Sequence, residues 1–149
     1  MSLQAGDKAP AFKGKDQDGN TISLNDFKGK KLVIYFYPKD DTPCCTAQAC
    51  NLRDNYTALL KANYAVIGIS TDDEKSHKKF IAKYQLPFPL IADTDKSINE
   101  QFGVWKEKSM FGKNYMGTVR TTFVINEKGI IEEVIDKVKT EEHTAQILK

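Results

Sequence analysis

The sequence predicts an α/β fold in which helices cover both faces of a mixed central sheet. Two apolar runs, at residues 31–37 (KLVIYFY) and 64–70 (YAVIGIS), have the β-branched and aromatic composition of strands buried on both faces. Apolar residues at helical spacing follow each run. Strands that alternate with helices along the chain are typical of layered α/β proteins, so we expect three layers.

The N-terminal half begins with a predicted β-hairpin. Residues 14–24 (GKDQDGNTISL) carry an Asp18-Gly19-Asn20 turn between two short extended segments. After the first apolar run, residues at spacings of three and four predict an amphipathic helix from Pro43 to about Ala62. A second helix is expected at residues 74–84, with its apolar side chains facing inward: Phe80, Ile81 and Tyr84.

The C-terminal half completes the order of elements. Residues 88–93 (FPLIAD) predict a short extended piece, and residues 97–102 a helical segment. Residues 118–126 and 129–138 predict an antiparallel strand pair, and a helix is expected in the last ten residues. This order fits a thioredoxin-like architecture. The length of 149 residues, without repeats or linkers, predicts one domain.

Composition and charge narrow the classes of partner. The formal net charge is +2, with acidic and basic residues interspersed, so we expect neither a nucleic-acid nor a membrane-surface partner. The N-terminus lacks a secretory signal, and no apolar run approaches the ~18 residues that span a bilayer. We therefore expect a cytoplasmic protein, in which clustered cysteines are catalytic, redox-sensing or metal-binding rather than structural.

All three cysteines of the chain lie within residues 44–50. If Thr42 is the N-cap and Pro43 the first helical residue, Cys45 is the third residue of the helix. Unpaired N–H groups and the positive end of the helix dipole favour an anion there, so the Cys45 thiol should ionise readily. A buried, unreactive thiol is the alternative interpretation of the same position.

Cys50 lies five residues after Cys45, too far for a disulfide in an intact helix. This offset separates the two Cα atoms by roughly 8.7 Å, whereas a disulfide requires ~4.4 to 6.8 Å. The two thiols can pair only if the first turns unwind. A metal site is less favoured, because the cysteine spacing is not that of zinc modules and because His77 and His143 are expected to be solvated residues of surface helices.

Two separated motifs resemble those of a known family. Pro38, Thr42 and Cys45 match the Pro-x3-Thr-x2-Cys motif of the peroxiredoxins, and Arg120, before a "TF" strand, resembles their catalytic arginine. Cys50 resembles the resolving cysteine of the bacterioferritin-comigratory-protein (peroxiredoxin Q) subfamily. The resemblance covers nearly the whole chain and implies a single peroxiredoxin (AhpC/TSA-type) domain over residues 1–149.

The resemblance also implies a thiol peroxidase without a cofactor. Cys45 would attack hydrogen peroxide or an organic hydroperoxide and become a sulfenic acid, which Cys50 would resolve as a disulfide. Thr42 would hold the peroxide, Arg120 would stabilise the thiolate, and Pro38 would shield it from water. Thioredoxin or a similar dithiol would reduce the product. The subfamily is often monomeric, so we expect a monomer.

One position departs from the subfamily. The residue before the peroxidatic cysteine is commonly glycine there, but it is Cys44 in this chain. Cys44 removes a flexible residue where the helix must unwind, and it adds a third thiol. Two other functions stay open from the sequence: a non-enzymatic redox-sensing protein that uses the same disulfide, and a metal-binding module.

Overall fold

The central sheet has five strands and mixed direction. The computed structural model describes residues 3–110 and 112–148, and its strand order is β5–β4–β3–β8–β9. β3 is parallel to β4 and β4 to β5, whereas β8 is antiparallel to both β3 and β9. The strands, in sheet order, are Leu90–Ala92, Tyr64–Ser70, Lys31–Phe36, Thr121–Ile125 and Ile131–Ile135.

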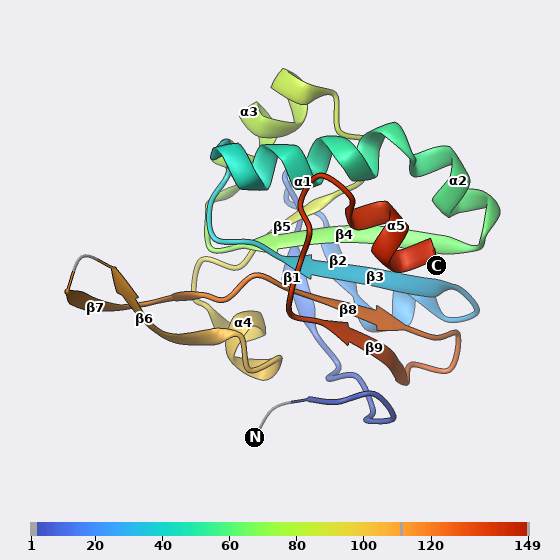
Figure 1. Cartoon of the computed structure of the whole chain (residues 1–149). Helices are drawn as coiled ribbons and strands as arrows, with labels where there is room; N and C mark the ends of the chain where they lie inside the picture. The colour runs from blue at the N-terminus through green and yellow to red at the C-terminus, as the bar shows by residue number, and fades with distance from the viewer. Residues whose placement is uncertain (1–2, 111, 149) are drawn as a thin grey trace.

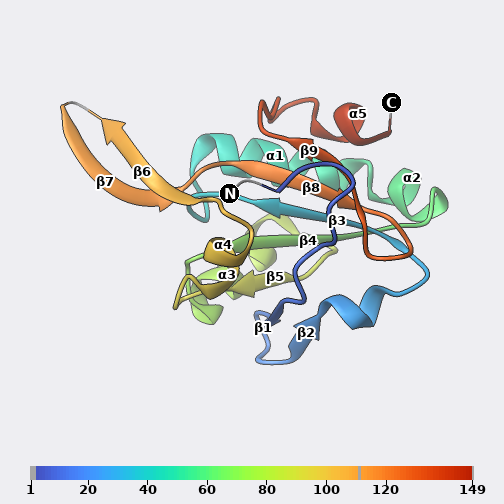
Figure 2. The same ribbon diagram turned by 90° about the horizontal axis from the view of Figure 1, so that it is seen from below.

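Helices cover both faces of this sheet, as predicted. One face packs against α1 (Pro43–Asp54), α2 (Tyr56–Lys61), α3 (Glu74–Tyr84) and α5 (His143–Leu148). In Figure 1, α1 and α3 lie above the sheet and α5 lies in front of it. The other face packs against α4 (Ser97–Gln101) and the N-terminal segment, which lie in front of the sheet in Figure 2. None of the helices in the described part of the chain is long and apolar enough to cross a bilayer.

Strand β3 shows why the core divides in two. Its side chains alternate between the faces, with Val33 and Tyr35 in the cluster beneath α1 and Leu32, Ile34 and Phe36 in the cluster near α4. All five are at most 1% exposed. The continuous apolar run therefore reflects burial on both faces, as expected from the sequence.

The predicted N-terminal hairpin is confirmed. β1 (Lys13–Lys15) pairs antiparallel with β2 (Thr21–Ser23), and the short helix η1 (Leu24–Phe27) follows. The predicted second helix coincides with α3, the predicted strand pair with β8 and β9, and α5 falls in the last ten residues, of which residue 149 lies outside the described residues.

The single helix expected from Pro43 to about Ala62 is two helices, so this prediction is wrong at one point. The break is at Asn55, between α1 and α2, with φ −111° and ψ 13°. The side-chain amide of Asn55 donates to the Asn51 carbonyl at 2.8 Å. The backbone N–H of Asn55 donates to the same carbonyl at 3.3 Å. A short amide side chain thus competes with the helical ladder and interrupts it.

Residues 105–118 form a hairpin that the sequence did not predict. β6 (Trp105–Met110) pairs antiparallel with β7 (Lys113–Thr118), and the pair projects from the body of the protein. Figures 1 and 2 both show it leaving at the end of the sheet where the loop from β3 enters α1. It lies near the predicted reactive cysteine.

The prediction that His77 and His143 are solvated is wrong. Both side chains are fully buried. His77 lies on the inner side of α3, and its Nδ1 and Nε2 contact Asp40 and the Ile91 carbonyl. His143 begins α5 and contacts the Thr122 hydroxyl through Nε2. Helical periodicity of apolar residues does not reveal buried polar residues whose partners come from other elements.

Candidate active site

The loop after β3 sets the start of α1. Thr42 has the extended backbone of an N-cap, φ −94° and ψ 156°, and Pro43 follows as the first helical residue, as predicted. The Thr42 carbonyl accepts the first bond of the helix, from Thr46 N at 2.8 Å. Its hydroxyl does not cap the helix but donates to the Lys39 carbonyl at 3.0 Å. This contact fixes the hydroxyl at the entrance to α1.

Cys45 is in contact with Arg120, so the two sequence motifs that contain these residues lie side by side in the folded protein. Cys45 is 1% exposed, and the Arg120 guanidinium donates to its Sγ from Nη2 at 3.1 Å. The other arm, Nη1, donates to Gln48 Oε1 at 2.5 Å. The guanidinium and the N-terminal N–H groups of α1 thus place hydrogen-bond donors and positive charge beside the Cys45 sulfur.

Gln48 is a site residue that the sequence analysis missed. It is fully buried one turn after Cys45, and its side-chain oxygen orients Arg120. Its Nε2 is buried without a hydrogen-bond partner among the described residues. The signal was present in the sequence, because a polar residue three positions after Cys45 lies on the same face of the helix.

The charges of the site influence the pKa of two further side chains. Burial raises the pKa of the Tyr35 phenol well above its ordinary value, and the charges of Asp40 and Cys45 raise it further. Burial lowers the pKa of Lys108, from β6, and the positive charge of Arg120 lowers it further, whereas Cys45 opposes that change. Neither residue belongs to a recognisable local motif, so the sequence analysis did not identify them.

Cys44 and Cys50 have surroundings unlike those of Cys45. Cys44 is exposed and Cys50 is half-buried, and all three thiols are free. Cys45 and Cys50 both lie in the intact helix α1. The separation predicted for an intact helix therefore applies, and a bond between them requires local unwinding. Pro38 is half-buried at the start of the loop, two residues after the last residue of β3.

A set of buried polar contacts holds the loop between Pro38 and Thr42. Asp40 accepts from the Tyr37 hydroxyl at 2.6 Å and from the Ser76 hydroxyl at 2.8 Å, and His77 Nδ1 lies 2.7 Å from the same carboxylate. The Asp40 N–H donates to Asp72 at 2.8 Å. We call this set of five residues the loop clasp. It ties the loop to α3 and to the end of β4.

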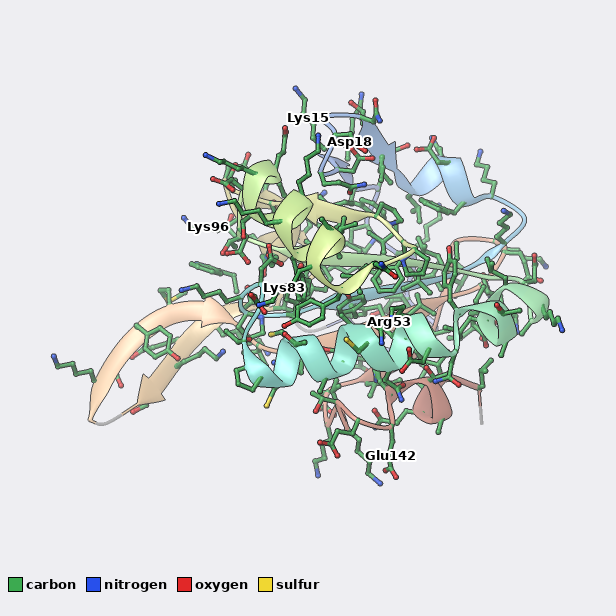
Figure 3. All side chains as sticks on the ribbon, turned by 90° about the horizontal axis from the view of Figure 1, so that it is seen from above. Lys15, Asp18, Arg53, Lys83, Lys96 and Glu142 are labelled. Atoms are coloured by element: carbon green, nitrogen blue, oxygen red, sulfur yellow. The ribbon has the colours of Figure 1, made fainter. Side chains whose placement is uncertain are left out.

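The next residue adds a second attachment to α3. Asp41 has φ 58° and accepts from Lys83 Nζ and from the Tyr84 hydroxyl, each at 2.8 Å. These hydrogen bonds lower the pKa of Asp41, and Asp41 in turn raises the pKa of Lys83. Figure 3 shows Lys83 reaching from α3 toward the start of α1. Two consecutive carboxylates thus fix the loop that leads to Cys45.

The carboxylates of Asp40 and Asp72 and the His77 imidazole lie close enough together to hold a metal ion. Their donor atoms already have partners: His77 Nε2 lies 2.9 Å from the Ile91 carbonyl, and Asp72 accepts from the Ser70 hydroxyl at 2.7 Å. The cysteines take no part in this group. The arrangement fits a structural hydrogen-bond network better than a metal centre.

Comparison with known proteins agrees with this geometry. The model of the AhpC/TSA family matches residues 5–134. Peroxiredoxin Bcp of Escherichia coli is 49% identical over 146 residues, covering 98% of this chain and 94% of that protein. Peroxiredoxin Bcp of Bacillus subtilis is 43% identical over 149 residues, covering 100% of this chain and 95% of that protein.

Solved structures give the same result for the fold. Xanthomonas campestris Peroxiredoxin Q has a TM-score of 0.89 at 35% identity, covering 98% of this chain and 95% of that one. A Xylella fastidiosa PrxQ mutant has a TM-score of 0.93 at 31% identity, covering 99% and 94%. The Xanthomonas campestris Bacterioferritin Comigratory Protein, studied for its alkyl peroxide reduction activity, has a TM-score of 0.88 at 34% identity, covering 95% of each chain.

The predicted fold and enzyme class are thereby confirmed. The thioredoxin-like sheet, the cysteine at the start of α1 and the relatives along nearly the whole chain agree with one another. An enzyme is favoured over the non-enzymatic sensor and the metal-binding module, because the named relatives are peroxiredoxins. This chain belongs to the AhpC/TSA family and is a peroxiredoxin of the Bcp and PrxQ type, a thiol peroxidase.

Proposed function

We propose that the Cys45 thiolate reduces hydrogen peroxide and organic hydroperoxides. The observation that carries this proposal is the 3.1 Å contact from Arg120 Nη2 to Cys45 Sγ at the N-terminus of α1. The sulfur attacks one peroxide oxygen, an S–O bond forms, and the O–O bond breaks. The departing oxygen takes up a proton and leaves as water or an alcohol, and Cys45 becomes a sulfenic acid.

The neighbouring residues have matching roles in this proposal. Thr42, fixed by its bond to the Lys39 carbonyl, holds the peroxide through its hydroxyl. Arg120 stabilises the thiolate and polarises the peroxide, since its fork contacts Cys45 and Gln48 together. Pro38 shapes the start of the loop and keeps water from the sulfur. Organic hydroperoxides are included because the Xanthomonas relative was studied for alkyl peroxide reduction.

Cys50 resolves the sulfenic acid after the first turns of α1 unwind. The Cys50 thiol attacks the Cys45 sulfenic sulfur, an S–S bond forms, and water leaves. Thioredoxin or a similar dithiol then reduces the disulfide and is itself oxidised. Cys44, exposed and adjacent to Cys45, is a bystander in this scheme.

The cellular setting follows from the same proposal. The whole chain acts as one peroxiredoxin domain without a cofactor, as a monomer in the cytoplasm, in antioxidant defence and redox homeostasis. Its partners are peroxides and a dithiol reductant, with neither nucleic acid nor membrane involved. A net charge of +2 with interspersed signs supports this set of partners.

The proposal is tested by single cysteine substitutions. Stopped-flow consumption of hydrogen peroxide, with thioredoxin and its reductase supplied, should disappear in Cys45→Ser. Cys50→Ser should consume about one equivalent of peroxide and then stop, whereas Cys44→Ser should match the wild type. Peptide mass mapping after one equivalent of peroxide should show the Cys45–Cys50 disulfide. Full activity in Cys45→Ser, or a dominant Cys44 disulfide, would refute the assignments.

A further inference from the structure

The peptide bond between Lys39 and Asp40 is held by hydrogen bonds on both sides. Its carbonyl oxygen accepts from the Thr42 hydroxyl at 3.0 Å. Its N–H donates to Asp72 Oδ2 at 2.8 Å. Because a peptide bond is planar, a contact that fixes the N–H also fixes the direction of the carbonyl. The direction of the Thr42 hydroxyl therefore depends on Asp72, which lies 32 residues after Asp40 in the chain.

The Asp72 carboxylate is itself fixed at the end of β4. Ser70, the last residue of β4, is fully buried, and its hydroxyl donates to Asp72 Oδ2 at 2.7 Å. The Asp72 N–H donates back to the Ser70 hydroxyl oxygen at 3.2 Å. One carboxylate oxygen thus joins the buried end of β4 to the loop before α1. Since β4 lies between β3 and β5 in the sheet, this oxygen has a rigid support.

The other contacts of the loop clasp act on a different group. They reach the Asp40 side chain, from Tyr37, Ser76 and His77 at 2.6 to 2.8 Å. A side chain can rotate relative to its own backbone, so these contacts fix where the loop lies and not the plane of the peptide bond. Within residues 3–110 and 112–148, the hydrogen bonds of that peptide bond come from Thr42 and go to Asp72.

The contact with the Lys39 carbonyl also decides what the Thr42 hydroxyl can do. A hydroxyl group has one proton to donate and two lone pairs that accept. Thr42 uses its proton in the bond to the carbonyl, so its oxygen is left to accept from a bound molecule. Hydrogen peroxide and alkyl hydroperoxides each carry an O–H that can donate to it. If the carbonyl turned away, the lone pairs of Thr42 would no longer have a fixed direction.

We propose that Asp72 is a positioning residue for peroxide reduction, because it orients the peptide bond between Lys39 and Asp40 and thereby the Thr42 hydroxyl. Asp72 acts through Thr42 and is not a catalytic residue. This inference rests on the proposed role of Thr42 in holding the peroxide. Its physical basis is that a small displacement of a group that positions the substrate reduces the rate strongly.

The test compares two reagents that attack the same sulfur. Both rates are measured in the Cys44→Ser/Cys50→Ser background, where Cys45 is the only thiol. Stopped-flow gives the second-order rate with hydrogen peroxide, and mass spectrometry gives the rate with methyl methanethiosulfonate, which carries no O–H or N–H donor for Thr42. Asp72→Ala should slow the peroxide reaction by about 10-fold and leave the second rate within about twofold. A general distortion of the site would slow both reactions.

Two variants serve as controls for Asp72→Ala. Asp72→Asn keeps an oxygen that can accept from the Asp40 N–H, so it should restore most of the peroxide rate. Asp73→Ala removes the neighbouring carboxylate, which caps α3 by accepting from Ser76 N at 2.8 Å. It should lower the thermal stability but leave both rates within about twofold, since it does not contact the peptide bond. Circular dichroism would show that each variant is folded.

A double variant tests whether Asp72 acts through Thr42. Thr42→Val removes the hydroxyl itself and should slow the peroxide reaction by about 10- to 100-fold. When Asp72→Ala is added to Thr42→Val, the rate should fall by less than about twofold further, because the group that Asp72 orients is already absent. Two residues that act independently would instead give the product of the two single effects.

The possible results distinguish this inference from the proposed function. A wild-type peroxide rate in Asp72→Ala, beside a slow Thr42→Val, would overturn the role of Asp72 alone. Equal slowing of both reagents in Asp72→Ala, or independent effects in the double variant, would also overturn it. A wild-type peroxide rate in Thr42→Val would instead overturn the role of Thr42 in the proposed function.

Discussion

Arg120 makes two directed contacts from two different nitrogens of its guanidinium. One arm of its guanidinium reaches Cys45 Sγ at 3.1 Å and the other reaches Gln48 Oε1 at 2.5 Å. The planar fork holds its donors in fixed directions, so Gln48 sets the orientation of the arm that faces the sulfur. A lysine at this position would keep the charge and lose the orientation.

We therefore expect Arg120→Lys to reduce the second-order rate with hydrogen peroxide by about 10- to 100-fold, a loss comparable to that of one positioned donor in an active site. The change should retain the fold, because Arg120 is only half-buried. Stopped-flow kinetics would measure the rate and circular dichroism the fold. A variant within twofold of the wild-type rate would show that charge alone is sufficient.

The lowered pKa of His143 predicts that the unfolding free energy of the protein depends on pH. Burial lowers its pKa below the ordinary 6.5, as does the charge of Arg120, while a hydrogen bond to Gln146 opposes both. The unfolded chain therefore binds more protons than the folded one in acid. The contribution of the neutral histidine is complete above about pH 6.5 and is lost as the pH falls below it.

Replacing His143 by glutamine should weaken the dependence of the unfolding free energy on pH in this range. Between about pH 7 and pH 5, the unfolding free energy of the wild type should fall more steeply than that of His143→Gln. Urea denaturation at several pH values gives the slope of the unfolding free energy against pH for both proteins. The other titratable groups are the same in both, so the difference between the two slopes reports the contribution of His143. Equal slopes would contradict the assignment.

Helices α1 and α5 are joined at Asn51, the residue after Cys50. The Asn51 side chain accepts from Thr144 N at 2.8 Å and donates to the Glu141 carbonyl at 2.9 Å, so it caps the start of α5 from another helix. The part of α1 that would unwind in the proposed function, between Cys45 and Cys50, thus ends where the helix is attached to its neighbour.

Asn51→Ala should destabilise the protein by about 1–2 kcal/mol, since two hydrogen bonds are lost while alanine improves helix propensity slightly. Asn51→Asp is the matched control, because it keeps the acceptor for Thr144 N and should lose less. Urea denaturation monitored by circular dichroism compares the two. Asn51→Ala with wild-type stability would show that the attachment is unimportant.

The elements that the sequence predicted well are those with a hydrophobic signal. Continuous apolar runs located β3 and β4, and apolar residues at helical spacing located α3. β6 and β7 carry no such pattern, because most of the hairpin is exposed, including Tyr115 and Met116. A hairpin that projects into solvent has no core-facing side, so alternation of apolar and polar residues does not predict it.

The site was predictable only where a motif marks it. Cys45 could be inferred from its place after Thr42 and Pro43, and Arg120 from its resemblance to a family motif. Gln48 contacts Arg120 only because α1 packs against the segment that leads into β8. The buried state of His77 likewise depends on Asp40, 37 residues earlier in the chain. Such long-range polar partners leave no local pattern.

For the molecule as a whole, the reactive end is assembled from distant segments. β3 supplies the loop to Cys45, the strand β8 follows Arg120, and the β6–β7 hairpin projects beside them, at one end of the sheet (Figure 1). The other end is formed by strand connections without cysteines. Chemistry is thus confined to the side where β3 and β4 have their carboxyl ends, as is common in open α/β sheets.

The loop clasp also has a consequence for the order of folding. Asp40 finds Asp72, Ser76 and His77 only after β4 and α3 have packed, and His77 needs β5 for its second contact. We therefore expect the surroundings of Cys45 to be completed late in folding, and a partly folded chain to expose the cysteine thiols. We expect refolding from urea to give a higher yield of active protein with a reducing agent present than in air, where mismatched disulfides would trap partly folded chains.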